Sequence, residues 1–96
     1  MGIRDFIHCL DEHRNRLKRS LSDREREETL REAETMVGMA DAAIRELESV
    51  LGNRRVNLPE EHAVRFAQDV FLYLREEEEK VKEALREPVS GDAAKG

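Results

Sequence analysis

Cysteine, tryptophan, proline and glycine are scarce in this chain. Its 96 residues include one cysteine, no tryptophan, two prolines, five glycines and only 4% aromatic residues. With Cys9 alone, the chain has no internal disulfide and no structural zinc site built from several cysteines. A chain without disulfides is typical of the reducing cytoplasm, so we expect a cytoplasmic protein.

Long apolar runs and an excess of positive charge are also missing. No stretch approaches the roughly 20 apolar residues that a membrane helix needs, so we expect no membrane association. Asp and Glu (22 residues) outnumber Lys and Arg (17 residues), for a net charge of -5. Because clustered positive charge drives binding to nucleic acid and to anionic lipid, neither is favoured as a partner.

What the sequence does contain is charge of both signs and helical periodicity. Charged residues make up 41% of the chain, which is typical of long exposed helices. A heptad stripe, with spacings that alternate between three and four, runs through the middle of the chain: Leu30, Ala33, Val37, Ala40, Ile44, Leu47 and Leu51. Such a stripe forms one apolar seam along a helix, and another helix must cover it. The predicted fold class is therefore all-α.

Local signals mark where the helices begin and end. Ser22 and Glu25 have the spacing of a capping box, which begins a helix. Gly52 suits the left-handed position just past a helix end, and Pro59 suits the first turn of the next helix. Pro88 ends that helix. The expected helices lie over about residues 3–19, 23–51 and 59–87.

The length of the chain fits one helical domain, over residues 1–88. The tail over residues 89–96 has too few apolar side chains to bury and is expected to be disordered. Gly38, inside the second helix, costs up to about 1 kcal/mol relative to Ala. Gly38 either allows the close approach of a neighbouring backbone or is simply tolerated in the helix, and because several nearby residues are also small, we expect the close approach.

The two long helices, folded back on each other, form a hairpin about 40 Å long. The first helix is much shorter, so it covers only the half of the hairpin near the chain ends. The half next to the connection, here called the distal half, stays open. Between Ala63 and Leu74 the third helix is apolar over more of its circumference than one neighbour covers. We therefore expect a three-helix bundle-like fold completed by oligomerisation, most simply as a two-fold homodimer.

The predicted interface residues lie on the two arms of the hairpin: Ile44, Leu47, Val64, Phe66, Val70, Phe71 and Tyr73. Phe66 and Tyr73 are the aromatic residues best suited to dominate the binding energy. The alternative is a monomer in which the first helix tilts or slides over these side chains. Leaving all of them exposed would make an unusually large apolar patch, and this favours association.

Asp5, His8 and Glu12 share one side of the first helix at spacings of three and four. Di-iron bundles need Glu-x-x-His repeats on facing helices, and this chain has no Glu-x-x-His. A solvated polar face explains the three residues better, so we expect no metal and no cofactor. His13 falls on the apolar side of the same helix, where we expect it to be partly buried and hydrogen-bonded. His62 is expected at the surface.

Catalysis has little basis in the sequence. Cys9 and His13 lie one helical turn apart and are the residue types of a thiol nucleophile and its base. A cysteine within an amphipathic helix is, however, more often a packed core residue. The chain has no glycine-rich phosphate loop, nucleophile elbow or dinucleotide fingerprint. We therefore expect a protein that is not an enzyme.

Positive charge is concentrated in two groups, one at the end of the first helix and one in the connection: Arg14, Arg16, Lys18 and Arg19, and then Arg54 and Arg55. These residues support an alternative function, a small nucleic-acid-associated regulator. Cations are favoured at a helix C-terminus, and the expected fold brings the first group near acidic residues, so intramolecular pairing explains it better. The acidic run from Glu76 to Glu79 is expected to be a solvated face.

The third helix begins with Leu58, Pro59, Glu60 and Glu61, which are followed by Phe66, Tyr73, Glu79 and Val81. In this pattern it resembles the helical hairpin of the exonuclease VII small subunit, an accessory chain without catalytic residues. The likeness covers about half of the chain. It departs from that family in the longer connection and in the presence of a first helix, and no functional residue is carried over from it.

These patterns predict a non-catalytic helical protein–protein interaction module, such as an accessory subunit, an adaptor or a small regulator. Its expected partner is a second copy of itself or another helical protein. Besides the nucleic-acid regulator, a metal- or small-molecule-binding helical bundle is the remaining alternative.

Overall fold

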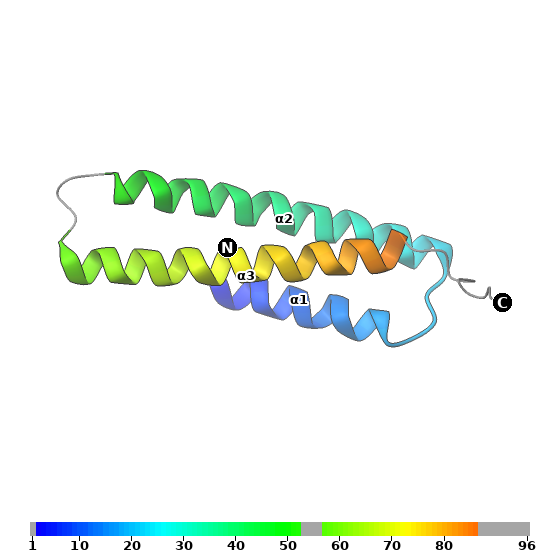
Figure 1. Cartoon of the computed structure of the whole chain (residues 1–96). Helices are drawn as coiled ribbons and strands as arrows, with labels where there is room; N and C mark the ends of the chain where they lie inside the picture. Colours follow the sequence, from blue (N-terminus) through cyan, green and yellow to red (C-terminus); the bar gives the residue numbers. More distant parts are fainter. Residues whose placement is uncertain (1, 53–56, 87–96) are drawn as a thin grey trace.

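The computed structural model describes residues 2–52 and 57–86, and over these residues the protein forms three helices and no strand (Figure 1). The helices are α1 (Ile3–Leu17), α2 (Asp23–Leu51) and α3 (Leu58–Arg86). α2 and α3 run antiparallel as a hairpin, and α1 lies along one end of it, parallel to α3 (Figure 1). The molecule is a rod of 58 × 22 × 16 Å. The predicted all-α hairpin with a short first helix is confirmed.

The short first helix divides the hairpin into two halves. In the proximal half, residues 23–40 of α2 and 71–86 of α3, three helices pack together (Figure 1). In the distal half, residues 41–51 and 58–70, the two arms contact mainly each other. The physical reason is length: the 15 residues of α1 extend about 22 Å, whereas the 29 residues of each arm extend about 43 Å.

Side-chain caps set the starts of both long helices. The Ser22 hydroxyl accepts a hydrogen bond from the Glu25 backbone N–H at 3.1 Å, and the Glu25 carboxylate accepts one from the Ser22 N–H at 3.0 Å. The predicted capping box is therefore confirmed. α3 begins one residue earlier than expected because the Asn57 side chain accepts from the Glu60 N–H at 2.9 Å, with Pro59 in the first turn as predicted.

Two predictions about glycines are wrong. Gly52 is not left-handed: its φ of -74° and ψ of -9° are right-handed, because its N–H continues the helical pattern to the Glu48 carbonyl at 3.1 Å. Gly38 allows no close approach: a Cβ placed there would have no neighbouring atom within 4 Å, because the residue faces solvent. The predicted effect of Pro88 and the predicted disordered tail lie outside the described residues.

The hydrophobic core lies in the proximal half, where the three helices meet. The Phe6 ring of α1 packs edge to face on Phe71 of α3, with ring centroids 5.1 Å apart. The buried apolar residues come from all three helices: Phe6, Leu10, Ala33, Met36, Val37, Ala40, Phe71, Leu74, Val81 and Leu85. The heptad stripe is thus buried at its centre, from Ala33 to Ala40. Towards the connection its residues Ile44, Leu47 and Leu51 stay partly exposed.

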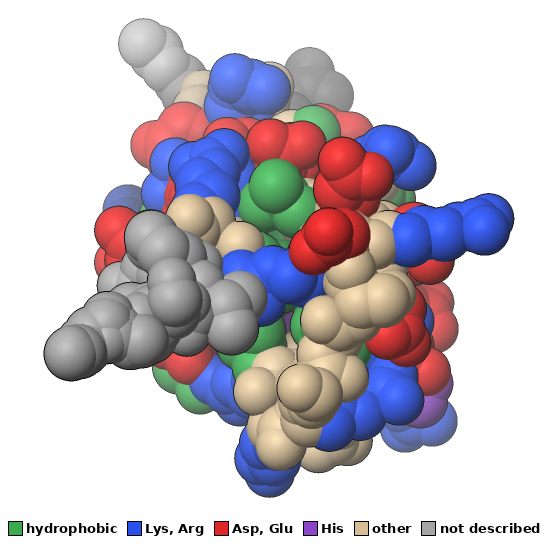
Figure 2. All heavy atoms as spheres, turned by 90° about the vertical axis from the view of Figure 1, so that its right-hand side faces the viewer, with side chains coloured by type: hydrophobic (Ala, Val, Ile, Leu, Met, Phe, Trp, Pro, Cys, Tyr) green, Lys and Arg blue, Asp and Glu red, His purple; other side chains and the backbone are tan. Residues whose placement is uncertain are grey.

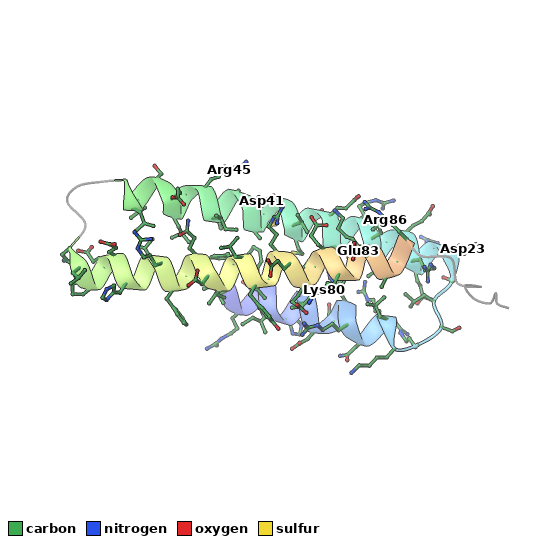
Figure 3. All side chains as sticks on the ribbon, viewed as in Figure 1. Asp23, Asp41, Arg45, Lys80, Glu83 and Arg86 are labelled. Atoms are coloured by element: carbon green, nitrogen blue, oxygen red, sulfur yellow. The ribbon has the colours of Figure 1, made fainter. Side chains whose placement is uncertain are left out.

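Polar contacts also join the two arms of the hairpin. The Gln68 side chain donates to the Glu48 carboxylate at 2.6 Å, and Arg75 lies 2.5 Å from the Asp41 carboxylate. Arg86 reaches Glu34 near the end of the hairpin (Figure 3 labels Asp41 and Arg86). These contacts join α2 to α3 directly, without side chains of α1.

Candidate interaction surface

The open surface of the distal half is apolar at positions singled out from the sequence. Phe66 keeps 71% of its surface exposed, and Tyr73, at the border of the two halves, keeps 51%. These two residues lie two helical turns apart on α3 and therefore share one side of the helix. Four other predicted interface residues are partly exposed on the two arms: Ile44, Leu47, Val64 and Val70.

Phe71, the seventh predicted interface residue, lies in the core of the single chain. Only 9% of its surface is exposed, because Phe6 of α1 covers its ring. α1 begins at Ile3, only one turn before Phe6, so its cover of α3 ends near Phe71. Phe71 lies where the covered seam ends and the open seam begins.

A hollow of about 240 Å³ marks the end of the covered seam. It is lined by Phe6 of α1 and by four residues of α2: Met39, Ala42, Ala43 and Glu46. Because one residue of α1 and several of α2 line the same hollow, this side of α2 is the side that α1 packs against. The hollow therefore extends from Phe6 along α2 into the distal half, where Glu46 contributes a charged side chain to its lining.

Ile7 is an exposed apolar residue near this surface that sequence reasoning missed. It lies two turns before Arg14, which pairs with Glu77 and is 3.5 Å from the Tyr73 hydroxyl. Ile7 therefore projects from the side of α1 that borders this edge of α3. Its place among the apolar residues of the first helix was the signal that could have identified it.

A buried polar cluster joins the three helices of the proximal half. His13 and Glu78 are only 1% and 2% exposed. The His13 Nδ1 lies 2.8 and 3.0 Å from the two carboxylate oxygens of Glu78 on α3, and Nε2 lies 3.2 Å from Glu32 on α2. The predicted burial and hydrogen bonding of His13 are confirmed. The prediction that the whole acidic run is solvated is wrong for Glu78, because four consecutive helical residues spread around the helix and one of them must face inwards.

The electrostatics of this cluster do not favour thiol chemistry. Burial of the His13 ring lowers its pKa, but hydrogen bonds and negative charge from Glu78 and Glu32 outweigh this and raise the pKa above the ordinary 6.5. Burial, followed by the charge of nearby carboxylates such as Glu12, raises the pKa of the Cys9 thiol above 9.0. An activated nucleophile needs the opposite shift. Both ring nitrogens of His13 already face carboxylates.

The basic group at the end of α1 pairs within the molecule. Arg14 pairs with Glu77 of α3, Arg16 lies 3.0 Å from Glu32, and Arg19 lies 3.8 Å from Glu25 of α2. Figure 2, a view onto this end of the rod, shows Lys and Arg side chains interspersed with Asp and Glu around a few apolar ones. The expected intramolecular pairing is confirmed for these three arginines. Arg54 and Arg55 lie outside the described residues.

The residues considered as metal ligands have other roles in this fold. The Asp5 carboxylate accepts from the Gly2 N–H at 3.2 Å and so caps α1. His8 and Glu12 lie 3.7 Å apart on the exposed side of α1. His62 is exposed, as predicted. Over residues 2–52 and 57–86, no three His, Cys, Asp or Glu side chains are grouped so that they could hold a metal ion.

Comparison with known proteins gives no family for this chain: no family model, curated protein or solved structure matches it.

Among the helices of the described residues, none has a stretch long and apolar enough to cross a membrane.

Proposed function

We propose that the protein is a non-catalytic helical interaction module that assembles through the distal half of its hairpin, most simply as a two-fold homodimer. The observation that carries this proposal is the exposure of two aromatic side chains, Phe66 and Tyr73, on one side of α3. A helix of another protein is the other occupant of suitable chemistry.

The proximal half supports the proposal because there a helix already covers an apolar surface of the same two arms. There, an amphipathic helix covers the seam and buries Phe6 and Leu10 against the two arms. Burying a large apolar side chain contributes about 1.5–3 kcal/mol relative to leaving it exposed. Covering Phe66 and its neighbours in the distal half offers a comparable gain, and a partner helix can provide it.

A second copy is the simplest partner because the open halves have equal length and the same apolar side chains. In a two-fold dimer the same surface of both copies forms the interface, so each distal half covers the other. The two α1 helices then lie at opposite ends of the assembly. This arrangement needs no change in the fold of either chain.

Sedimentation equilibrium at micromolar concentration tests the proposal on the wild type and on Phe66→Glu. We expect the wild type to form a dimer and Phe66→Glu to sediment as a monomer with its helical circular dichroism retained, because the charge would have to be buried in the interface.

The matched control is Leu72→Glu, which changes an exposed apolar residue of α3 about a third of a turn from Tyr73 and away from Phe66. We expect this variant to remain a dimer. A wild type that sediments only as the 11.1 kDa chain contradicts the homodimer. Dissociation by Leu72→Glu but not by Phe66→Glu places the interface on another side of α3.

A further inference from the structure

The buried His13 ring needs a proton on both of its nitrogens. A neutral imidazole carries one N–H and one bare nitrogen. In either neutral tautomer, the bare nitrogen of His13 would face a carboxylate oxygen, of Glu78 at 2.8 Å or of Glu32 at 3.2 Å, with no proton between them. Only the doubly protonated ring donates to both. The docked position of α1 therefore selects the charged form of His13.

Charged groups from all three helices lie around this ring. Those in direct contact with it are Glu78 of α3 and Glu32 of α2. The surrounding groups pair with one another or with these two: Arg16 with Glu32, and Arg14 and Lys80 with Glu77. Within residues 2–52 and 57–86, Glu78 pairs with His13, and Glu32 pairs with His13 and Arg16. Loss of the His13 proton leaves both carboxylates facing a neutral ring.

α1 is the helix most easily released by this loss. Its inward side is held by Phe6, Leu10 and His13, and an isolated helix of this length is marginal in water. The α2–α3 hairpin has its own buried contacts, from Ala33 to Ala40 on α2 and from Leu74 to Leu85 on α3, and its own polar cross-links. Weakening the His13 cluster therefore affects the attachment of α1 before the pairing of the two arms.

We propose that α1 is a proton-dependent clasp, which stays docked on the hairpin while His13 is charged and is released from a still folded hairpin when His13 loses its proton. Release uncovers Phe71 and joins the covered seam to the open one along the length of the hairpin. The proposal concerns the attachment of α1 and holds whether or not the distal half binds a partner.

The direction of the pH dependence follows from linkage. The pKa of His13 is higher in the docked state than its ordinary value of 6.5, so docking takes up a proton. The stabilisation of the docked state is complete below pH 6.5 and is lost as the pH rises through the raised pKa. Alkaline conditions therefore favour the released helix.

Native-state hydrogen exchange of the full chain between pH 6 and pH 9 tests the proposal. Dividing intrinsic by measured rates gives a protection factor for each amide at each pH. We expect α1 amides to be less protected than the core amides of α2 and α3, because α1 opens separately. We also expect their protection to fall several-fold across this range. Equal protection of α1 and of the core at every pH, or an α1 protection that does not change with pH, overturns the proposal.

Two histidine variants assign the titrating group. His13→Gln keeps a hydrogen-bonding side chain but does not titrate, so we expect weak α1 protection at pH 6 and no further fall up to pH 9. His8→Gln is the matched control, because His8 lies exposed on the same helix, and it should retain the full fall. The opposite pattern, with the fall lost in His8→Gln and kept in His13→Gln, overturns the proposal.

Glu32→Gln provides a test that does not remove a buried side chain, since Glu32 is exposed. The amide that replaces the Glu32 carboxylate would donate to the bare Nε2 of a neutral ring, while the Nδ1–H still donates to Glu78. We therefore expect the fall in α1 protection to become smaller than in the wild type. An undiminished fall in Glu32→Gln contradicts the requirement for a proton on both nitrogens.

Discussion

The two halves of the hairpin differ in what they enclose. The proximal half is covered by α1 and buries a hydrogen-bonded polar pair, His13 and Glu78, among apolar side chains. The distal half lacks this cover and exposes an aromatic ring, Phe66, to solvent. Polar groups usually lie outside and apolar groups inside, and this distribution is reversed at both places. The presence of α1 in one half and its absence from the other account for both. Three helices can surround a buried polar pair with hydrogen-bonding partners, whereas two helices leave the outer sides of an apolar seam uncovered.

The largest expected effect comes from comparing one aromatic residue in each half. Phe71→Ala removes a buried ring that packs on Phe6, and we expect it to lower the free energy of unfolding by about 3–4 kcal/mol. Phe66→Ala removes an exposed ring and should change it by less than about 0.5 kcal/mol in the monomer. Urea denaturation followed by circular dichroism, at a concentration that keeps the chain monomeric, measures both. Similar losses in the two variants would remove the distinction between the halves.

The helix caps at the two ends of the hairpin give a smaller contrast. Ser22→Ala removes the cap of α2 in the proximal half and should cost about 1 kcal/mol, measured by urea denaturation. Asn57→Ala removes the cap of α3 in the distal half and should cost less, because an end that few contacts hold can fray without disturbing the core. A larger loss for Asn57→Ala would show that the distal end is the better-ordered one.

The smallest expected effect is a gain in stability. Gly38→Ala adds a methyl group to an exposed helix interior with no atom in its way, and we expect it to raise the free energy of unfolding by about 0.5–1 kcal/mol. Gly52→Ala is the control at the distal end, where the added Cβ would lie 3.4 Å from the Ser49 carbonyl oxygen. It should give less, because Gly52 is the C-cap residue just past the end of α2 and not a helix-interior position. A thermal or urea midpoint for each variant decides the order.

The helix boundaries were predictable from short sequence signals. Ser22 and Glu25 act within one turn of the chain, and Pro59 acts on its own backbone, so nothing distant alters them. The incomplete cover of the hairpin was equally predictable, because it follows from the lengths of the helices. The exposure of Phe66 and Tyr73 followed from the surplus of apolar residues on one arm.

The burial of Glu78 and of Phe71 was not predicted, for two different reasons. Glu78 lies within four consecutive glutamates, and its partner His13 is 65 residues away in the chain. The spacing of Glu78 from Leu74 and Val81 does place it on the buried stripe, but the charge of its neighbours concealed this. Phe71 is covered only because α1 extends far enough along α3 for Phe6 to reach it, and no local pattern measures that distance.

The sequence by itself determined three helices, their approximate ends and the apolar stripes along them, because capping and periodicity depend on residues within a few turns. Only the tertiary structure decided which helix covers which stripe. The rotation and the sliding of α1 along the hairpin place His13 between Glu78 and Glu32, and they leave Phe66 uncovered. These are relative positions of whole helices, and they follow from packing across the molecule, not from the spacing of residues within one segment.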